Sequence, residues 1–222
     1  MASERTSGAP GRRPLIRGSD EFSRVLAFSD GLFAIAMTLL VVSIAVPTLS
    51  VPGDERELFD ALRDLDSAFV SFFISFVVIG RYWVAHHQFF RLLRELDYGL
   101  VWLNLIYLAF VAFLPFPTAL LGAYFENPVS VAMYAATVAL VSGLEVVMFR
   151  HAHDRGLVER PIPDDVYRWG VLMSLAPVAV FLGSIPVAFL DTGLAVLCWL
   201  LVIPLEMLLD RRKPPASDEY LG

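Results

Sequence analysis

The chain alternates between long apolar runs and short polar stretches, and this alternation predicts its architecture. Six apolar runs are long enough to cross a bilayer as helices, which takes about 20 residues each. Their approximate limits are 24–47, 67–90, 99–122, 129–150, 167–186 and 191–209. The connections between the second, third and fourth runs are short, so these three runs are expected to be antiparallel neighbours. The pattern predicts an all-α integral membrane protein with six transmembrane helices.

The first run, Arg24 to Pro47, is unusual because a Phe-Ser-Asp-Gly cluster lies near its start. On a helical wheel of about 100° per residue, one stripe of the run is nearly all apolar. The stripe holds Arg24, Phe28, Gly31, Ile35, Thr38, Leu39, Val42 and Val46. Ser29 and Asp30 fall outside the stripe, Asp30 by roughly 140°. The helix therefore has two faces, and Thr38 is either a hydroxyl on a functional face or a threonine bonded back to its own backbone.

The charged residues are distributed unevenly between the two predicted sides of the membrane. The 222 residues are 57% hydrophobic and 18% charged, far more apolar than a soluble domain. Of 17 Lys and Arg residues, only Arg56 and Arg63 lie in loops after the first, third and fifth runs. By the positive-inside rule, both termini are expected in the cytoplasm of a multi-pass protein of the cell membrane. Residues 1–23 are expected to be a partly disordered cytoplasmic arm, residues 24–210 the six-helix domain and residues 211–222 a cytoplasmic tail.

The loop after the first run is acidic, with six carboxylates between residues 54 and 66. Leu58, Phe59, Leu62 and Leu65 are interspersed at helical spacing, which favours a short surface helix. The acids are either those of an ordinary solvated loop or a means of raising the cation concentration at an outer mouth.

Polar residues of the first three runs lie at one predicted depth, in the half nearer the cytoplasm. They are Arg24, Ser29, Asp30, Trp83, His86 and Asn104. An unsatisfied polar group in hydrocarbon costs several kcal/mol, so these side chains are expected to bond to one another. Such a network either relays protons and supports catalysis, or it holds the helices together and fixes the rotation of the first one. The position of Ser29 and Asp30 off the stripe favours the structural interpretation.

The remaining ionisable residues give no clear metal or catalytic site. His86 and His87 are adjacent and face different directions on a helix, so they do not form a metal site by themselves. The tract at His151, His153 and Asp154 has a more ligand-like spacing, but its basic boundary position favours an interfacial role. Glu145 and Glu206 lie near the cytoplasmic ends of their runs. They are expected to pair at the interface with Arg150, Arg211 or Arg212.

Taken in order, the polar motifs resemble those of the bacterial members of the transmembrane protein 175 family of potassium channels. The resemblance rests on Arg24-x3-Phe28-Ser29-Asp30 followed by Ile35 and Thr38, on Trp83-x2-His86, on Asn104, and on Pro115-Phe116-Pro117-Thr118. It covers the first half of the chain, whereas the later runs resemble the family only in number and apolarity. It implies a six-helix subunit, four of which form a homotetramer around a central pore lined by the first helix.

The resemblance also implies roles for the stripe. The pore constriction is a ring of bulky aliphatic side chains, which corresponds to Ile35 with Leu39 and Val42, and the hydroxyl layer corresponds to Thr38. The six polar residues correspond to a structural network. An aliphatic ring stops ions by excluding water. Because Thr38 offers only hydroxyls in place of a carbonyl filter, modest selectivity for potassium over sodium is expected.

The sequence therefore predicts a passive, potassium-preferring cation channel, with the bilayer, monovalent cations and further copies of itself as partners. No cofactor other than the permeant potassium ion, no metal site and no nucleic-acid partner is expected. The alternative is a proton-coupled or cation-coupled secondary transporter that uses Asp30 and His86. The lack of a substrate site and of an inverted repeat counts against it. A membrane enzyme using His86 and His87 would lack a nucleophile or metal constellation.

Overall fold

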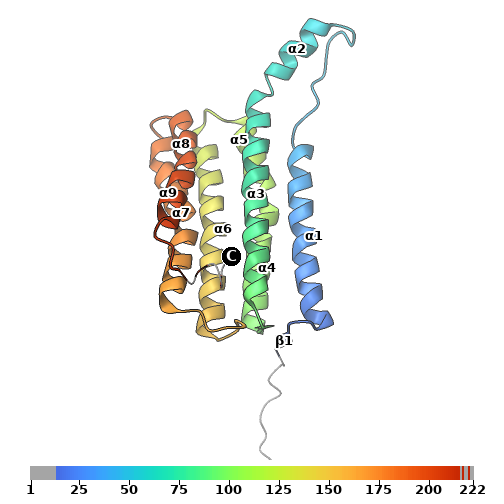
Figure 1. Cartoon of the computed structure of the whole chain (residues 1–222). Coiled ribbons are helices and arrows are strands. Elements are labelled where there is room, and N and C mark those ends of the chain that lie inside the picture. The colour runs from blue at the N-terminus through green and yellow to red at the C-terminus, as the bar shows by residue number, and fades with distance from the viewer. Residues whose placement is uncertain (1–13, 216, 218–219, 221–222) are drawn as a thin grey trace, which may run out of the picture.

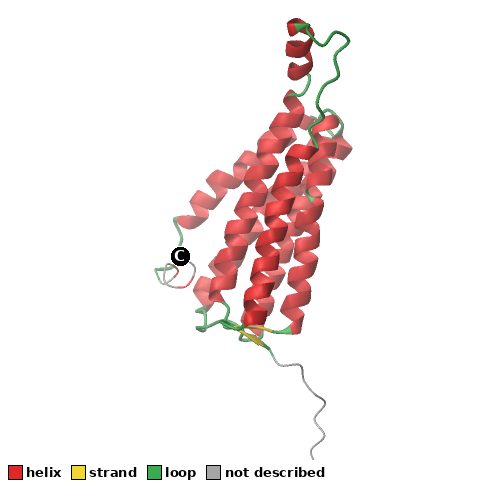
Figure 2. Ribbon diagram, turned by 90° about the vertical axis from the view of Figure 1, so that its right-hand side faces the viewer, coloured by secondary structure: helices red, strands yellow, loops and turns green. Residues whose placement is uncertain are grey.

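The computed structural model describes residues 14–215, 217 and 220, and shows a bundle of helices aligned with one long axis (Figures 1 and 2). Within these residues, six helical segments are long and apolar enough to cross a membrane. They are Asp20–Val42, Asp66–Leu92, Tyr98–Ala123, Pro128–Asp154, Asp164–Ala188 and Thr192–Asp210. Each covers one of the predicted runs, so the prediction of six helical spans is confirmed.

Helix α1 (Asp20–Val42) begins and ends earlier than the first apolar run. The Ser19 side chain caps the helix by accepting a hydrogen bond from the Phe22 N–H at 3.2 Å, so the helix starts before its apolar part. At the other end, the Ser43 hydroxyl bonds to the Leu40 carbonyl at 2.7 Å as the helix stops. The predicted limit of residue 47 is therefore wrong, and Val46 lies beyond the helix.

Helix α2 (Glu55–Arg63) stands beyond the top of the bundle as drawn in Figure 1, on a long loop after α1. Asp54 caps it by accepting bonds from the N–H groups of Arg56 and Glu57 at 2.9 and 3.1 Å. The Glu57 carboxylate folds back to accept bonds from the Ser50 hydroxyl and N–H, both at 2.7 Å. These hydrogen bonds hold the pKa of Glu57 below its ordinary value.

The next spans form the centre of the bundle. They are α3 (Asp66–Leu92), then α4 (Tyr98–Phe113) and α5 (Pro115–Ala123), which share the third run, and α6 (Pro128–Asp154). The third run breaks at Leu114 because Pro115 has no N–H and cannot continue the helical ladder. Where α5 meets α3, a Cβ on Gly122 would lie only 3.0 Å from the Ala68 Cα, so a glycine permits this close packing.

The last two spans pack at one side of the bundle, at the left of Figure 1. Helix α7 (Asp164–Ala188) carries Pro177 and Pro186 within it. The sixth run is divided into α8 (Thr192–Cys198), a short 3-10 segment η1 (Trp199–Leu201) and α9 (Val202–Asp210). The division falls just before Pro204, which cannot donate a hydrogen bond to the carbonyl of Leu200.

A two-stranded sheet closes the lower end of the bundle in Figure 2. Strand β1 (Leu15–Ile16) pairs antiparallel with β2 (Glu95–Leu96), with Leu15 opposite Leu96. The Arg17 guanidinium adds a hydrogen bond to the Arg91 carbonyl at 3.0 Å and an ion pair with Glu159 at 2.6 Å. The strand and the first turn of α1 thus occupy residues 15–23 of the predicted arm.

Two of the predicted segments lie partly outside the described residues. Residues 1–13 of the N-terminal arm do so, and in the C-terminal tail the structure describes residues 211–215, 217 and 220.

Candidate functional site

Helix α1 lies at the edge of the bundle opposite α7 and α9, and only one of its faces is covered by the rest of the chain (Figure 1). The covered face packs on α3, α4 and α5. Its buried residues are Phe22, Ser29, Phe33, Ala36 and Leu40. All eight residues of the predicted stripe are exposed instead, the last of them, Val46, beyond the end of the helix. The exposed fractions of Ile35 and Val42 are 60% and 74%. The structure therefore separates the two faces of α1 along the same line as the helical wheel.

Thr38 lies on the exposed face and also bonds to its own helix. Its Oγ1 donates a hydrogen bond to the Ile35 carbonyl at 2.8 Å. The two interpretations of this residue are therefore compatible. The hydroxyl proton is used within the helix, while the oxygen stays on the exposed face, where its lone pairs can accept hydrogen bonds or contact a cation.

Behind the exposed face, a buried triad joins α1, α3 and α4. The Asn104 Nδ2 donates to the Ser29 Oγ at 3.1 Å, and the Asn104 Oδ1 lies 2.8 Å from the His86 Nε2. Because an amide oxygen can only accept, the His86 Nε2 carries the hydrogen. All three residues are at most 2% exposed. Among the described residues, the His86 Nδ1 is the one buried side-chain nitrogen or oxygen without a hydrogen-bond partner.

Aromatic rings enclose His86. Its ring centroid lies 4.3 Å from that of Phe90, 5.7 Å from that of Tyr107 and 5.4 Å from that of Phe33. Sequence reasoning did not identify Phe33 or Tyr107. The signal was present, because Phe33 lies four residues after Ser29 and Tyr107 three residues after Asn104, spacings that place side chains on one helical face.

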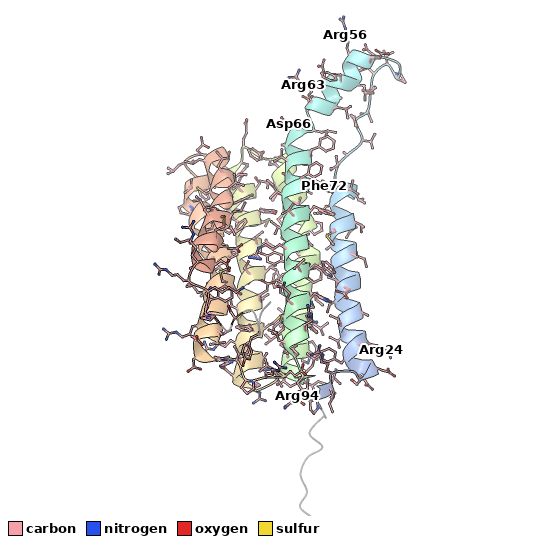
Figure 3. The ribbon with its side chains drawn as sticks, viewed as in Figure 1. Arg24, Arg56, Arg63, Asp66, Phe72 and Arg94 are labelled. Atoms are coloured by element: carbon pink, nitrogen blue, oxygen red, sulfur yellow. The ribbon has the colours of Figure 1, made fainter. Side chains whose placement is uncertain are left out.

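The other three predicted network residues do not join this triad. The Trp83 Nε1 donates to the Asp30 Oδ1 at 2.9 Å, which forms a separate pair between α3 and α1. Arg24 is exposed at the lower end of α1, and no hydrogen bond or ion pair of its side chain is found among the described residues (Figure 3). The reason is geometric, because Arg24 lies on the stripe, on the opposite side from Ser29.

Both half-buried glutamates, Glu145 and Glu206, have partners other than those predicted. Glu206 on α9 forms an ion pair with Arg81 on α3. Glu145 on α6 accepts a hydrogen bond from the Tyr107 hydroxyl at 3.0 Å. The pairing with Arg150, Arg211 or Arg212 was predicted from nearness in sequence and is wrong. Contacts between helices decide the partners instead.

The histidine tract at the end of α6 is divided between two contacts. The His151 Nε2 lies 3.0 and 3.1 Å from the two Asp97 carboxylate oxygens, whereas the His153 ring stacks on Tyr167 at 4.0 Å. Burial opposes ionisation of Asp97, but hydrogen bonds from the Leu100 N–H, His151 and Arg155 outweigh it and hold the Asp97 pKa below its ordinary value. Within the described part of the chain, no three His, Cys, Asp or Glu residues are grouped to hold a metal.

Comparison with known proteins gives consistent matches. The family described as endosomal/lysosomal potassium channel TMEM175 matches residues 24–115, the segment that holds the stripe and the triad. A potassium channel of Chamaesiphon minutus is 33% identical over 195 residues, which cover 82% of this chain and 92% of that protein. A potassium channel of Streptomyces collinus is 43% identical over 122 residues, 55% of this chain and 58% of that one.

A solved structure shares the fold across nearly the whole chain. It is the crystal structure of a lysosomal potassium-selective channel TMEM175 homolog from Chamaesiphon minutus. The TM-score is 0.69 at 32% identity, with 86% of this chain and 99% of that chain covered. The later helices, which carry few recognisable motifs, are therefore part of the same fold.

Proposed function

Since the chain belongs to the TMEM175 family of ion channels, we propose that it is a passive cation channel that prefers potassium. Four copies assemble with α1 of each around a central pore. The observation that carries this proposal is the face of α1 that the rest of the chain leaves uncovered. The buried triad supports it, because the bonds of Ser29 and Asn104 fix the rotation of α1 and so fix which face points outward.

The composition of the uncovered face argues for a pore rather than for lipid contact alone. Any helix that faces lipid exposes apolar residues, so apolarity by itself does not distinguish the two. The stripe also holds Arg24, Gly31 and Thr38, and small or hydroxyl residues are enriched where membrane helices meet.

The proposed constriction lies along the middle of this face. Ile35, Leu39 and Val42 follow at intervals of about one helical turn, so their side chains extend over about 10 Å of the pore axis. Four copies of these side chains make an apolar collar that stops ions by excluding water. Thr38 supplies the hydroxyls between Ile35 and Leu39, and hydroxyls alone support only modest discrimination between potassium and sodium.

The orientation follows from the charges at the two ends of the bundle. Arg17, Arg91 and Arg94 gather at the lower end, where the strands lie, whereas Arg56 and Arg63 lie on α2 at the other end (Figure 3). By the positive-inside rule, the lower end and both termini face the cytoplasm of the cell. The acidic α2 then lies at the outer mouth, where its carboxylates would raise the local cation concentration.

Reconstitution into vesicles tests the channel against the transporter. With a potassium gradient and equal pH on both sides, the full-length protein should carry a potassium current that protein-free vesicles lack. If the potassium flux stops when no net proton movement across the membrane is allowed, the channel proposal is overturned and a coupled transporter is favoured. Crosslinking in the same vesicles should yield four-chain products, and a dominant monomer that still conducts would overturn the tetramer.

A further inference from the structure

A large pocket lies within one subunit, away from the exposed face of α1. It has a volume of about 1090 Å³ and lies between α3, α6, α7 and the sixth span. This volume is slightly above the range of pockets that hold drug-sized ligands, about 300–1000 Å³. Most of its wall is apolar or aromatic, including Val77, Phe89, Trp169, Phe181 and Trp199. The channel function proposed above uses none of these residues.

One carboxyl group of the wall forms no ion pair with any residue in the described part of the chain. Of the carboxylates that line the pocket, Glu206 pairs with Arg81 and Glu159 pairs with Arg17. The Glu145 carboxylate also lines the pocket, and its partner in the described part of the chain is the neutral hydroxyl of Tyr107. An ionised carboxylate in such surroundings gains from a cation beside it, because the low dielectric strengthens the attraction.

The same region holds a second hydrogen-bond acceptor that receives no hydrogen bond from the described residues. His86 is a lining residue, and its Nδ1 has no hydrogen-bond partner among the described residues. The Tyr107 ring, which donates to Glu145, stacks on the His86 ring. This part of the pocket therefore carries a carboxyl group, and the unpaired ring nitrogen lies buried close behind it. A ligand that donates hydrogen bonds and carries positive charge suits this wall.

The apolar part of the wall indicates which kind of group the rest of the ligand carries. The pocket follows α3 from Val70 to Leu92, so it extends along most of that membrane-spanning helix. Trp169 and Trp199 add aromatic surface for hydrocarbon; the Trp199 ring stacks on Tyr134 and Phe181, and the Lys213 Nζ lies 5.8 Å from the Trp169 ring centroid. Apolar surface that follows a membrane-spanning helix in this way fits a hydrocarbon chain that has partitioned into the bilayer.

We propose that this pocket binds a single-chain amphiphilic amine, with its ammonium group against the Glu145 carboxylate and its hydrocarbon chain along α3. A fatty acid of the same length would place a second negative charge beside Glu145. A fatty alcohol would leave the carboxylate without a counterion. The site goes beyond the proposed channel function, because binding can be measured without any ion current.

Fluorescence of the pocket tryptophans tests the proposal. The full-length protein in lipid nanodiscs is titrated with 12-bromododecylamine, whose bromine quenches tryptophan on contact. Saturable quenching is expected, and Glu145→Gln should weaken binding at least about tenfold, the effect of losing a hydrogen bond to a charged group. The amide still accepts the Tyr107 hydrogen bond. Glu126→Gln, at an exposed loop position, is the matched control and should bind like the wild type.

Two ligands with the same chain length but other head groups, and a second variant of the pocket, serve as further tests. 12-Bromododecanol and 12-bromododecanoate should quench at least about tenfold more weakly than the amine at equal concentration in the bilayer. If Glu145→Gln does not fold, Ser174→Phe places a ring in the pocket wall without changing its charge and should abolish saturable quenching. Equal affinity for the three ligands, or unchanged amine binding in both variants, would overturn the proposal. Ion currents are not involved, so a failed channel test would leave this result unaffected.

Discussion

The Asn104 amide on α4 donates a hydrogen bond to the Ser29 hydroxyl on α1 at 3.1 Å, deep in the bundle. The same amide binds His86 on α3 through its oxygen, so one side chain connects three helices. Ser29 directly precedes Asp30 and lies on the opposite side of α1 from Ile35. A bond that holds Ser29 inward therefore holds Ile35 outward, and the polar triad and the exposed stripe are two consequences of one helix rotation.

Asn104→Leu should weaken the bundle without changing the ions that pass. The substitution removes two buried hydrogen bonds and leaves the Ser29 hydroxyl and the His86 ring without partners between helices. A loss of about 1–3 kcal/mol in the free energy of unfolding is expected. Thermal unfolding followed by size-exclusion chromatography in detergent measures it. Gln88→Leu also replaces a side-chain amide with leucine, but at an exposed position, and serves as the control. Stability equal to the control would show that the triad does not hold the helices.

His86→Ala separates the structural role of the triad from a role in permeation. The structural role predicts a lower yield of tetramer and unchanged ion selectivity in the channels that do form. His87→Ala changes the exposed neighbouring residue and should assemble normally. Normal assembly of His86→Ala with an altered ratio of potassium to sodium current would instead place His86 in the permeation path.

Ile35→Asn should increase the single-channel conductance. A ring of amides in place of aliphatic side chains would let water enter the collar, and a wet collar conducts ions. Val41→Asn is the matched control, because Val41 is also exposed on α1 but lies about 120° from Ile35 on the helical wheel. Unchanged conductance in Ile35→Asn, or an equal increase in both variants, would remove Ile35 from the constriction.

The sequence predicted those features that depend on one helix at a time. Hydropathy located the six spans, and the 3.6-residue period separated Ser29 from Ile35, because both signals are local. Helix ends were less accurate, since the Ser19 cap and the Ser43 turn act outside the apolar run.

Side-chain partners between helices could not be derived in the same way. Glu206 pairs with Arg81, which lies 125 positions away in the sequence, and Glu145 bonds to Tyr107 rather than to the nearby Arg150. Such pairs depend on how helices pack, which a single sequence does not state. For Arg24, the helical wheel was more accurate than the depth in the membrane. The wheel placed Arg24 on the stripe and therefore away from the triad, whereas its depth had grouped it with the network.

Asp30→Asn should leave the passive potassium current intact. Within the described residues, Asp30 accepts one hydrogen bond, from the Trp83 Nε1 at 2.9 Å, and an asparagine side chain can still accept it through its oxygen. Trp83→Phe removes the donor and should cost about 0.5–1.5 kcal/mol of stability. Vesicle flux assays and thermal unfolding measure the two effects. Loss of potassium flux in Asp30→Asn with normal assembly would favour the coupled transporter, in which the carboxylate titrates during the cycle.

The contact between Asp97 and His151 predicts how stability depends on pH. The pKa of Asp97 is lower in the folded protein than its ordinary value of 3.8, because the Leu100 N–H, His151 and Arg155 favour the carboxylate over the opposing effect of burial. The unfolded chain therefore binds the proton first as pH falls. The stabilisation is complete above pH 3.8 and is lost as pH falls through the folded-state pKa.

Asp97→Asn measures this contribution. The contact is partly exposed, so the loss near neutral pH should be below about 1 kcal/mol, or up to about 4 °C in the unfolding midpoint. The difference between wild type and variant should shrink once the pH falls below 3.8, because the unfolded wild-type chain then takes up a proton at Asp97 before the folded protein does. Asp60→Asn, at an exposed position on α2, should show no such difference at any pH. A difference that grows as the pH falls would contradict the assigned direction of the Asp97 pKa and would require its neighbours to favour the protonated acid.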